Sequence, residues 1–173
     1  MNGLIHIYTG DGKGKTTAAA GLALRAAGNG LRVVFLQFLK GTPSGEIPLL
    51  EQAGITVLRN GEDFGFFRNM TEDQKAIVTR IQNENLAEAL RLVKEGQCDL
   101  LVLDEVFAAC RNGTVDVSKI EALLTEKPEK LELVLTGRDA PQSFIERADY
   151  VSEIRKVKHP YDRGIGARKG IEF

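Results

Sequence analysis

Nine residues near the start of the chain form a glycine-rich loop of the kind that binds phosphate. They read Thr9-Gly10-Asp11-Gly12-Lys13-Gly14-Lys15-Thr16-Thr17. Glycines allow backbone N–H groups to approach a polyanion, because they have no Cβ and accept positive φ. Lys15 is placed to reach the terminal phosphates of a nucleotide, and the hydroxyl of Thr16 can bind Mg²⁺. The strict phosphate-binding pattern has glycine at the position of Thr9, so the loop departs from it there. The alternative interpretation is a glycine-rich turn that binds no nucleotide.

A second candidate for chemistry is the acidic pair Asp104 and Glu105, which follows the apolar run at residues 100–103. Nucleotide-binding proteins with such a loop hold their metal ion at an acidic strand end, directly or through water. Together, the loop and the acidic pair predict ATP or GTP with Mg²⁺ as the ligand, with the metal near Thr16 and Asp104. Without the loop, an acidic strand end exposed at the surface would be the alternative.

Apolar runs and helical patterns alternate along the chain, and these elements must position the loop and the acidic pair. We expect strands at residues 4–8, 32–38, 55–58, 99–103, 131–135 and 150–154, and helices at residues 15–27, 71–96, 118–124 and 141–147. Thr71 and Gln74 have the spacing of a capping box. A continuous apolar run such as residues 33–36 is typical of a strand buried on both faces. The pattern predicts an α/β fold over residues 1–173, one domain with a mostly parallel sheet and helices on both faces.

The composition narrows the class of protein. A chain of 173 residues with 43% apolar and 27% charged residues fits one soluble domain. The net charge of −1 gives no electrostatic reason to expect a nucleic acid or a membrane as partner. Cys98 and Cys110 have no metal-ligand spacing and are expected to be reduced thiols. No apolar run approaches the ~20 residues that span a bilayer, and no signal-peptide pattern is seen, so we expect a cytoplasmic protein.

Several short motifs, read in order, resemble the ATP:corrinoid adenosyltransferase family of the CobA/BtuR/CobO type. They lie at residues 9–17, 25–26, 37–41, 45–46, 103–105, 136–138, 157–160 and 164–172. The resemblance implies a RecA-like P-loop domain that transfers the 5′-deoxyadenosyl group of ATP to Co(I) of a reduced corrinoid. The products would be triphosphate and an adenosylcobalamin or adenosylcobinamide, in cobalamin biosynthesis or salvage. It also implies Mg²⁺ or Mn²⁺, a homodimer, and an electron donor such as a reduced flavin protein.

The implied reaction needs no protein nucleophile or general base, because Co(I) is itself a strong nucleophile. The protein must instead hold C5′ of ATP against cobalt and stabilise charge on the leaving triphosphate. We therefore expect Lys13, Lys15 and Glu105 to be catalytic. The expected nucleotide contacts are Gly10, Asp11, Gly12, Lys13, Gly14, Lys15, Thr16, Thr17, Arg25 and Arg138. For Arg25, a solvated charge on a helix is the alternative. The implied reaction also requires that C5′ of ATP, rather than the γ-phosphate, faces the acceptor.

The resemblance also implies residues for the corrinoid. An aromatic segment with Phe64, Phe66 and Phe67 is the candidate for displacing the lower axial ligand of cobalt, although the family's segment ends in Trp and this chain has no Trp. An ordinary core cluster is the alternative. The other candidates are Gln37, Lys40 and Glu46. They follow a strand at its carboxyl edge, where open α/β sheets bind ligands, and structural roles are the alternative.

The two histidines are predicted to have different environments. His159 lies in a basic segment that is either a solvated tail or folds back over the phosphates or the corrinoid, and His6 is expected to be a satisfied core or edge histidine.

Three other functions share the loop and the acidic pair. A small-molecule kinase would release ADP rather than triphosphate, and a RecA-like regulatory or motor ATPase would form larger assemblies and hydrolyse ATP. A nucleotide-binding module without activity is the third. Neither the kinase nor the ATPase accounts for the aromatic segment together with the C-terminal motifs. A module without activity requires impaired catalytic positions, and none of them looks broken.

Overall fold

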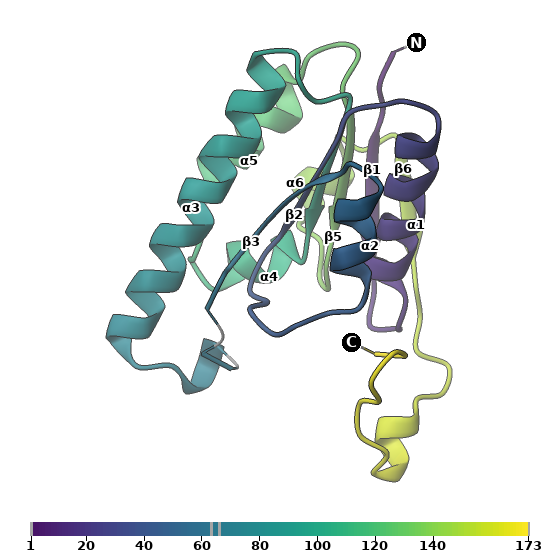
Figure 1. Cartoon of the computed structure of the whole chain (residues 1–173). Coiled ribbons are helices and arrows are strands. Elements are labelled where there is room, and N and C mark those ends of the chain that lie inside the picture. Colours follow the sequence, from purple (N-terminus) through teal and green to yellow (C-terminus); the bar gives the residue numbers. More distant parts are fainter. Residues whose placement is uncertain (1, 63, 66, 173) are drawn as a thin grey trace.

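Six parallel strands form one sheet at the centre of the molecule (Figure 1). The computed structural model describes residues 2–62, 64–65 and 67–172. The strands are β1 (Ile5–Thr9), β2 (Val33–Gln37), β3 (Thr56–Arg59), β4 (Leu100–Asp104), β5 (Glu132–Thr136) and β6 (Tyr150–Glu153). Their order across the sheet is β3-β2-β4-β5-β1-β6, and every neighbouring pair is parallel. The predicted α/β class with a mostly parallel sheet is confirmed.

Helices cover both faces of this sheet and give three layers (Figure 1). One face carries α1 (Lys15–Gly28) and α2 (Glu46–Gln52). The other carries α3 (Glu72–Lys94), α4 (Val106–Arg111), α5 (Val117–Glu126) and α6 (Gln142–Ile145). Two single 3₁₀ turns, η1 (Phe67–Asn69) and η2 (Pro160–Arg163), lie in the connections. Among the described residues, no helix has the length and apolar character needed to cross a membrane.

Each face of the sheet has its own hydrophobic core, because successive side chains of a strand point to opposite faces. In β2, Val34 and Leu36 pack with α3 to α6, whereas Val33 and Phe35 pack against α1 and α2. All five residues of β2 and of β4 are buried. This confirms that the continuous apolar runs are strands covered on both sides.

The expected elements agree with the structure within a few residues, and the differences are local. The Thr71 hydroxyl accepts from the backbone N–H of Gln74, and the Gln74 side chain accepts from the Thr71 N–H, which confirms the capping box. The short helices α2 and α4, of seven and six residues, were not predicted. Helices this short have little stability of their own, and the packing of the surrounding elements supports them.

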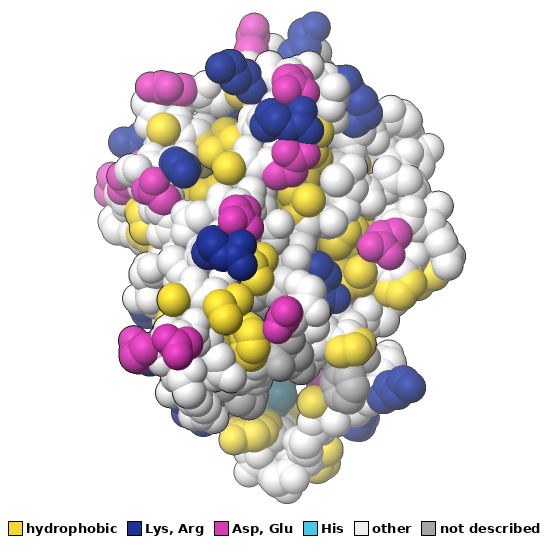
Figure 2. Space-filling model, turned by 60° about the vertical axis from the view of Figure 1, so that its left-hand side comes forward, with side chains coloured by type: hydrophobic (Ala, Val, Ile, Leu, Met, Phe, Trp, Pro, Cys, Tyr) yellow, Lys and Arg dark blue, Asp and Glu magenta, His cyan; other side chains and the backbone are white. Residues whose placement is uncertain are grey.

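The surface of the α3 side has acidic and basic side chains interspersed (Figure 2). On α3, Arg91 pairs with Glu88 at 2.7 Å and with Glu95 at 2.5 Å. Such pairs at helical spacing add only ~0.3–0.5 kcal/mol each, so this face is solvated rather than held by its charges.

The minor expectations for side chains away from the loop also hold. His6 is half-buried, its Nε2 pairs with a carboxylate oxygen of Glu132, and its ring stacks on Tyr150 at a centroid distance of 4.6 Å. Both cysteines are free, and burial raises the pKa of Cys98 to about 12 and that of Cys110 to about 11. Their thiols are therefore protonated and unreactive at neutral pH.

Candidate functional site

The glycine-rich loop joins β1 to α1 at the carboxyl edge of the sheet, and it rests on the segment that follows β6. The Gly12 N–H donates to the Ile154 carbonyl oxygen at 2.7 Å. A Cβ on Gly12 would lie 2.7 Å from that same oxygen, so a side chain cannot be accommodated without moving backbone. Gly14 is the N-cap of α1 with φ of 117°, a conformation that glycine adopts without strain. The loop thus directs its own N–H groups and the start of α1 toward the same space.

The side chain of Lys15 lies inside the loop. Only 7% of the residue is exposed, and Nζ donates to the Gly12 carbonyl oxygen at 2.7 Å. Burial lowers the pKa of Lys15, and the nearby carboxylates of Glu105, Asp11 and Asp104 oppose that shift. A buried ammonium next to a cradle of N–H groups is suited to bind a polyanion.

Asp104, the last residue of β4, is fully buried and receives three hydrogen bonds. The Thr136 hydroxyl donates to Oδ1 at 2.7 Å, and both the Thr16 hydroxyl at 3.3 Å and the Gln37 amide at 3.1 Å donate to Oδ2. Burial raises the pKa of Asp104, and the hydrogen bonds from these three donors oppose the shift. The predicted neighbourhood of Thr16 and Asp104 is therefore present.

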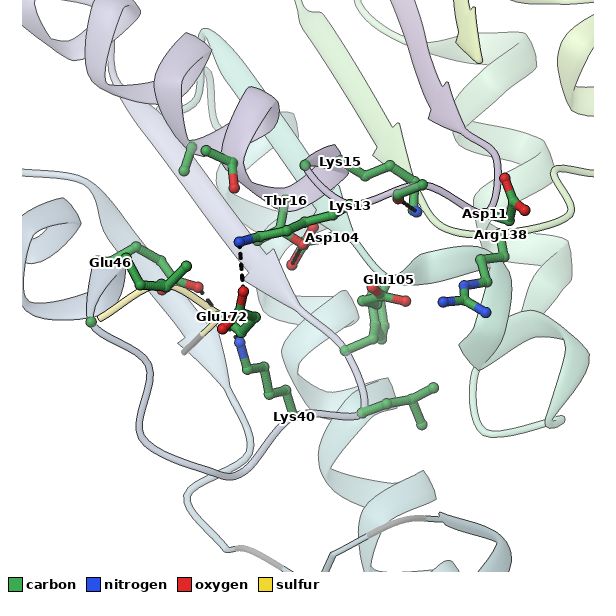
Figure 3. A pocket seen from close by; sticks show the side chains of 18 of the residues that line it. Asp11, Lys13, Lys15, Thr16, Lys40, Glu46, Asp104, Glu105, Arg138 and Glu172 are labelled. Carbon is green, nitrogen blue, oxygen red and sulfur yellow. Dashed lines mark hydrogen bonds and ion pairs between the residues drawn. The ribbon is translucent and has the colours of Figure 1, made fainter. Parts of the chain in front are cut away.

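Glu105 follows Asp104 in a left-handed conformation, with φ of 62°, and is the N-cap of α4. Its N–H donates to the Thr136 hydroxyl oxygen at 3.0 Å, so that hydroxyl must give its proton to Asp104. Burial and the charge of Asp104 raise the pKa of Glu105, whereas Lys15 and Arg138 oppose the shift. In Figure 3 the Glu105 carboxylate and the Arg138 guanidinium face one another. A non-glycine residue held at positive φ is often found at a functional site.

Two cavities lie along this edge of the sheet. The first has a volume of about 860 Å³, and its walls come from the loop, the segment after β2, the ends of β4 and β5, and the C-terminal segment (Figure 3). The second, of about 1010 Å³, is bordered by the η1 turn, the end of α4 and the η2 region. Both are lined by Asp11, Leu39, Arg138 and His159, so the two cavities meet at these four residues.

Most of the predicted site residues line these cavities. Those at the first cavity are Asp11, Gly12, Lys13, Gly14, Lys15, Thr16, Thr17, Lys40, Glu46, Asp104, Glu105 and Arg138. Phe67 lines the second cavity. Lys40 and Glu46 are joined by Ser44, whose hydroxyl lies 2.8 Å from Lys40 Nζ and 2.6 Å from a Glu46 carboxylate oxygen.

Four predicted residues that the structure describes do not line either cavity. Gly10 belongs to the loop but lines neither cavity. Gln37 is only 1% exposed and also lines neither cavity, and the same holds for Phe64. Arg25 is exposed in the last turn of α1, and ten residues of helix carry it about 15 Å along the axis from Lys15, so the structure does not bring it to the cavities. Phe66 lies outside the described residues.

The C-terminal segment was not predicted as part of the site, although its motif was noted. Gly170, Ile171 and Glu172 line the first cavity, and Glu172 pairs with Lys13 at 3.0 Å. Hydrogen bonds from Arg168 and Lys13 lower the pKa of Glu172 to about 2. Because 159 positions separate Lys13 from Glu172, no local pattern could have joined them. The basic segment around His159 also folds back over both cavities, as one of the two alternatives expected.

The residues present suit a divalent cation. Thr16 and Asp104 supply oxygen donors only 3.3 Å apart, and hard cations such as Mg²⁺ bind oxygen. Across residues 2–62, 64–65 and 67–172, no three His, Cys, Asp or Glu side chains group together as metal ligands. Mg²⁺ commonly uses one or two protein oxygens and completes its shell with substrate phosphates and water. The donor set at Thr16 and Asp104 fits that pattern.

The chain was also compared with known proteins. A family model described as "ATP:corrinoid adenosyltransferase BtuR/CobO/CobP" matches residues 1–173. The corrinoid adenosyltransferase of Escherichia coli K12 is 36% identical over 172 residues, covering 99% of this chain and 86% of that protein. The corrinoid adenosyltransferase CobA of Salmonella typhimurium is 35% identical over 173 residues, with the same coverage. A corrinoid adenosyltransferase of Sinorhizobium sp. is 36% identical over 176 residues, covering 99% of this chain and 80% of that protein.

Proposed function

Because this chain belongs to the ATP:corrinoid adenosyltransferase family, we propose that its first cavity binds ATP and its second cavity binds the corrinoid. The protein is an enzyme that transfers the 5′-deoxyadenosyl group of ATP to the Co(I) centre of a reduced corrinoid, in cobalamin biosynthesis or salvage. The proposal concerns which residues perform this transfer. The observation that carries it is the meeting of the two cavities at Asp11, Leu39, Arg138 and His159.

The triphosphate is assigned to the loop. Its N–H groups, the N-terminus of α1 and the ammonium groups of Lys13 and Lys15 all supply positive charge to one wall of the first cavity. The packing of the loop on Ile154 fixes the backbone N–H groups before the reaction, and the hydrogen bond to Gly12 fixes Lys15. Lys13 is held by its ion pair with Glu172. Preorganised donors of this kind stabilise charge as it develops on a leaving group.

The ribose C5′ is assigned to the junction of the two cavities. The cobalt lone pair forms the new Co–C5′ bond, the C5′–O bond breaks, and its electron pair leaves with the triphosphate. No proton has to be removed from a nucleophile, so Glu105 and Arg138 act by charge rather than as general base and acid. Holding the reacting atoms in near-attack geometry can lower the barrier by roughly 7–11 kcal/mol. We assign that role to the walls of the junction.

A divalent cation, Mg²⁺ or Mn²⁺, is proposed at Thr16 and Asp104. Both residues are at the wall of the first cavity, and their oxygens face each other at 3.3 Å. Neutralisation of triphosphate charge is the chemistry that such a cation supplies when bound. Asp104 is held ready for it by its hydrogen bonds to Thr136, Gln37 and Thr16.

For the corrinoid, Phe67 is the residue of the predicted aromatic segment that lines the second cavity, where Tyr161 is a further aromatic side chain. Phe64 and Phe66 remain predictions for the same role. Lys40 and Glu46, which were also predicted for the corrinoid, line the first cavity, which we assign to ATP. We further propose one catalytic domain over residues 1–173, a homodimer, a reduced flavin protein as electron donor, and a cytoplasmic location. These four statements follow from the family and from the sequence rather than from contacts in the structure.

The test is anaerobic incubation of the enzyme with ATP, Mg²⁺ and chemically reduced Co(I) corrinoid. The absorbance of the corrinoid and the phosphate product are followed together. We expect an adenosylcorrinoid and one equivalent of triphosphate per turnover, with the yield abolished when Lys15 is replaced by Met. Release of ADP or of free phosphate with an unchanged corrinoid would contradict the assignment of the two cavities and favour a kinase or an ATPase.

A further inference from the structure

Gln37 is a buried polar side chain that reaches the proposed metal site only through Asp104. It is the last residue of β2, is 1% exposed, and lines neither cavity. Its register partner across the sheet is Asp104, the last residue of β4. Because a buried amide is costly unless its groups are paired, the partners of Gln37 indicate what it is there to hold.

The Gln37 side chain acts on two carboxylates, and its amide nitrogen is hydrogen-bonded to one of them. It donates to Asp104 Oδ2 at 3.1 Å. Burial raises the pKa of Glu46, but hydrogen bonds from Ser44, from the backbone and from the Gln37 side chain, together with the charge of Lys40, bring this pKa below its usual range. An amide NH₂ has two protons, so the hydrogen bond to Asp104 leaves one proton free for the side of Glu46.

The other atom of the amide, Gln37 Oε1, is buried and has no hydrogen-bond partner among the described residues. Leaving a buried acceptor unpaired is unfavourable, so packing alone does not explain why this position is a glutamine. The side chain is thus oriented by the hydrogen bond of its nitrogen to Asp104, and both Asp104 and Glu46 line the first cavity.

Beyond Glu46, the polar contacts continue into the segment after β2. The Ser44 hydroxyl bonds to Glu46 at 2.6 Å and to Lys40 at 2.8 Å. Figure 3 shows Asp104 close to Thr16, with Glu46 and Lys40 on the other side of the same cavity. Gln37 is therefore the link between the acidic end of β4 and residues 40–46.

We propose that Gln37 is a positioning residue that fixes Asp104 for the divalent cation and couples metal–nucleotide binding to residues 40–46. This inference rests on the metal site of the proposed function. Groups that orient a metal ligand commonly change metal affinity by ~10–100-fold when they are removed. The same link predicts that residues 40–46 become better ordered when ATP and the metal bind together.

The test compares Gln37→Met with Gln82→Met. Methionine has nearly the shape of glutamine without its hydrogen-bonding groups. Gln82 is the matched control, because it is also 1% exposed, accepts a hydrogen bond from Thr114, and has an unpartnered amide nitrogen, yet it lies on α3 away from the cavities. Calorimetry without corrinoid gives the dissociation constant of ATP with MgCl₂ and with EDTA.

In the wild type, Mg²⁺ should tighten ATP binding. In Gln37→Met this gain should fall by ~10–100-fold while binding in EDTA is unchanged, and Gln82→Met should behave as the wild type. Hydrogen exchange provides a second measurement. Residues 40–46 should be protected by Mg²⁺ and ATP in the wild type and in Gln82→Met, but not in Gln37→Met.

A wild-type Mg²⁺ gain and wild-type protection in Gln37→Met would overturn the inference and leave the metal site intact. Absence of any Mg²⁺ gain in the wild type would overturn the metal site and this inference together, while the formation of triphosphate tests the transfer itself separately. If Gln37→Met does not fold, Gln37→Asn serves instead, because its amide is one carbon shorter and cannot reach Asp104 from the same backbone position. Asn should lose the gain as Met does, and retention would count against the inference.

Discussion

Replacing Thr136 with Val should measure how strongly the buried carboxylate of Asp104 depends on its donors. Thr136 is fully buried, and valine has nearly its shape without the hydroxyl. The change removes the 2.7 Å hydrogen bond to Asp104 and leaves the N–H of Glu105 without its acceptor. A hydrogen bond to a charged group contributes ~1.5–3 kcal/mol, and an orphaned N–H adds to that loss. We expect the free energy of unfolding to fall by about 3 kcal/mol at neutral pH.

The matched control is Thr114→Val. Thr114 is 1% exposed, and its hydroxyl donates to Gln82 Oε1 at 2.9 Å, a neutral acceptor. A neutral hydrogen bond contributes ~0.5–1.5 kcal/mol, so this variant should lose about 1 kcal/mol. Urea unfolding followed by circular dichroism gives both values, because a change in the midpoint at constant slope reports stability.

The pH dependence provides the sharper test. Burial raises the folded-state pKa of Asp104 above its unfolded value, and Thr136→Val should raise this pKa further because one donor to the ionised form is gone. As the pH falls through that pKa, the carboxyl takes up a proton and no longer needs the donor. The cost of Thr136→Val should therefore shrink toward acidic pH, while the cost of Thr114→Val stays constant. Equal costs for the two variants, or a cost of Thr136→Val that does not depend on pH, would refute this account of Asp104.

Three further predictions concern the loop, the C-terminal segment and the second cavity. Gly12→Ala should unfold or inactivate the enzyme, because its Cβ would meet a backbone oxygen at 2.7 Å, whereas Gly21→Ala, with open space around it, should raise stability by ~0.5–1 kcal/mol in urea unfolding. The pKa of Glu172 is lowered to about 2, so its ion pairs with Arg168 and Lys13 should be fully formed above the ordinary carboxyl pKa. They should be lost only as the pH falls through about 2, which a carboxyl NMR titration would show. Phe67→Ala should raise the KM for corrinoid more than Phe64→Ala, since Phe67 lines the second cavity and Phe64 does not, and equal changes in the two variants would place the corrinoid elsewhere.

The parts of the site that depend on local sequence could be predicted. The glycine-rich loop, the helix after it and the strand ending in Asp104 each carry their signal within a few residues. The capping box at Thr71 is equally local. Such features are set by backbone conformation and by burial, which the order of residue types reveals directly.

The parts that depend on contacts across the chain could not be predicted from local patterns. Gln37 was expected at the corrinoid because it follows a strand at the ligand-binding edge, but its side chain is turned to Asp104, 67 positions later. Thr136 was noted only within a motif, because its role requires β5 to lie next to β4. Arg25 entered through family resemblance alone, and the length of α1 places it far from the loop.

The register of three strands explains why Asp104 has the partners it has. Gln37 is paired with Asp104, and Leu103 is paired with Leu135, so Thr136 falls level with Asp104 on its other side. Neighbouring strands are about 4.8 Å apart, so side chains at one level and on one face can reach each other. The preceding residues Leu36, Leu103 and Leu135 belong to the core beneath α3 to α6.

Because side chains alternate, the last residues of β2, β4 and β5 must then point to the face that carries α1. That face also carries the start of α1, so the Thr16 hydroxyl meets the Asp104 carboxylate although 88 positions separate them. A slip of one residue in either strand pairing would turn the polar group into the core and place a leucine beside the phosphate-binding loop. The apolar residues of the opposite core therefore fix the geometry of the site, since they are what makes that slip unfavourable.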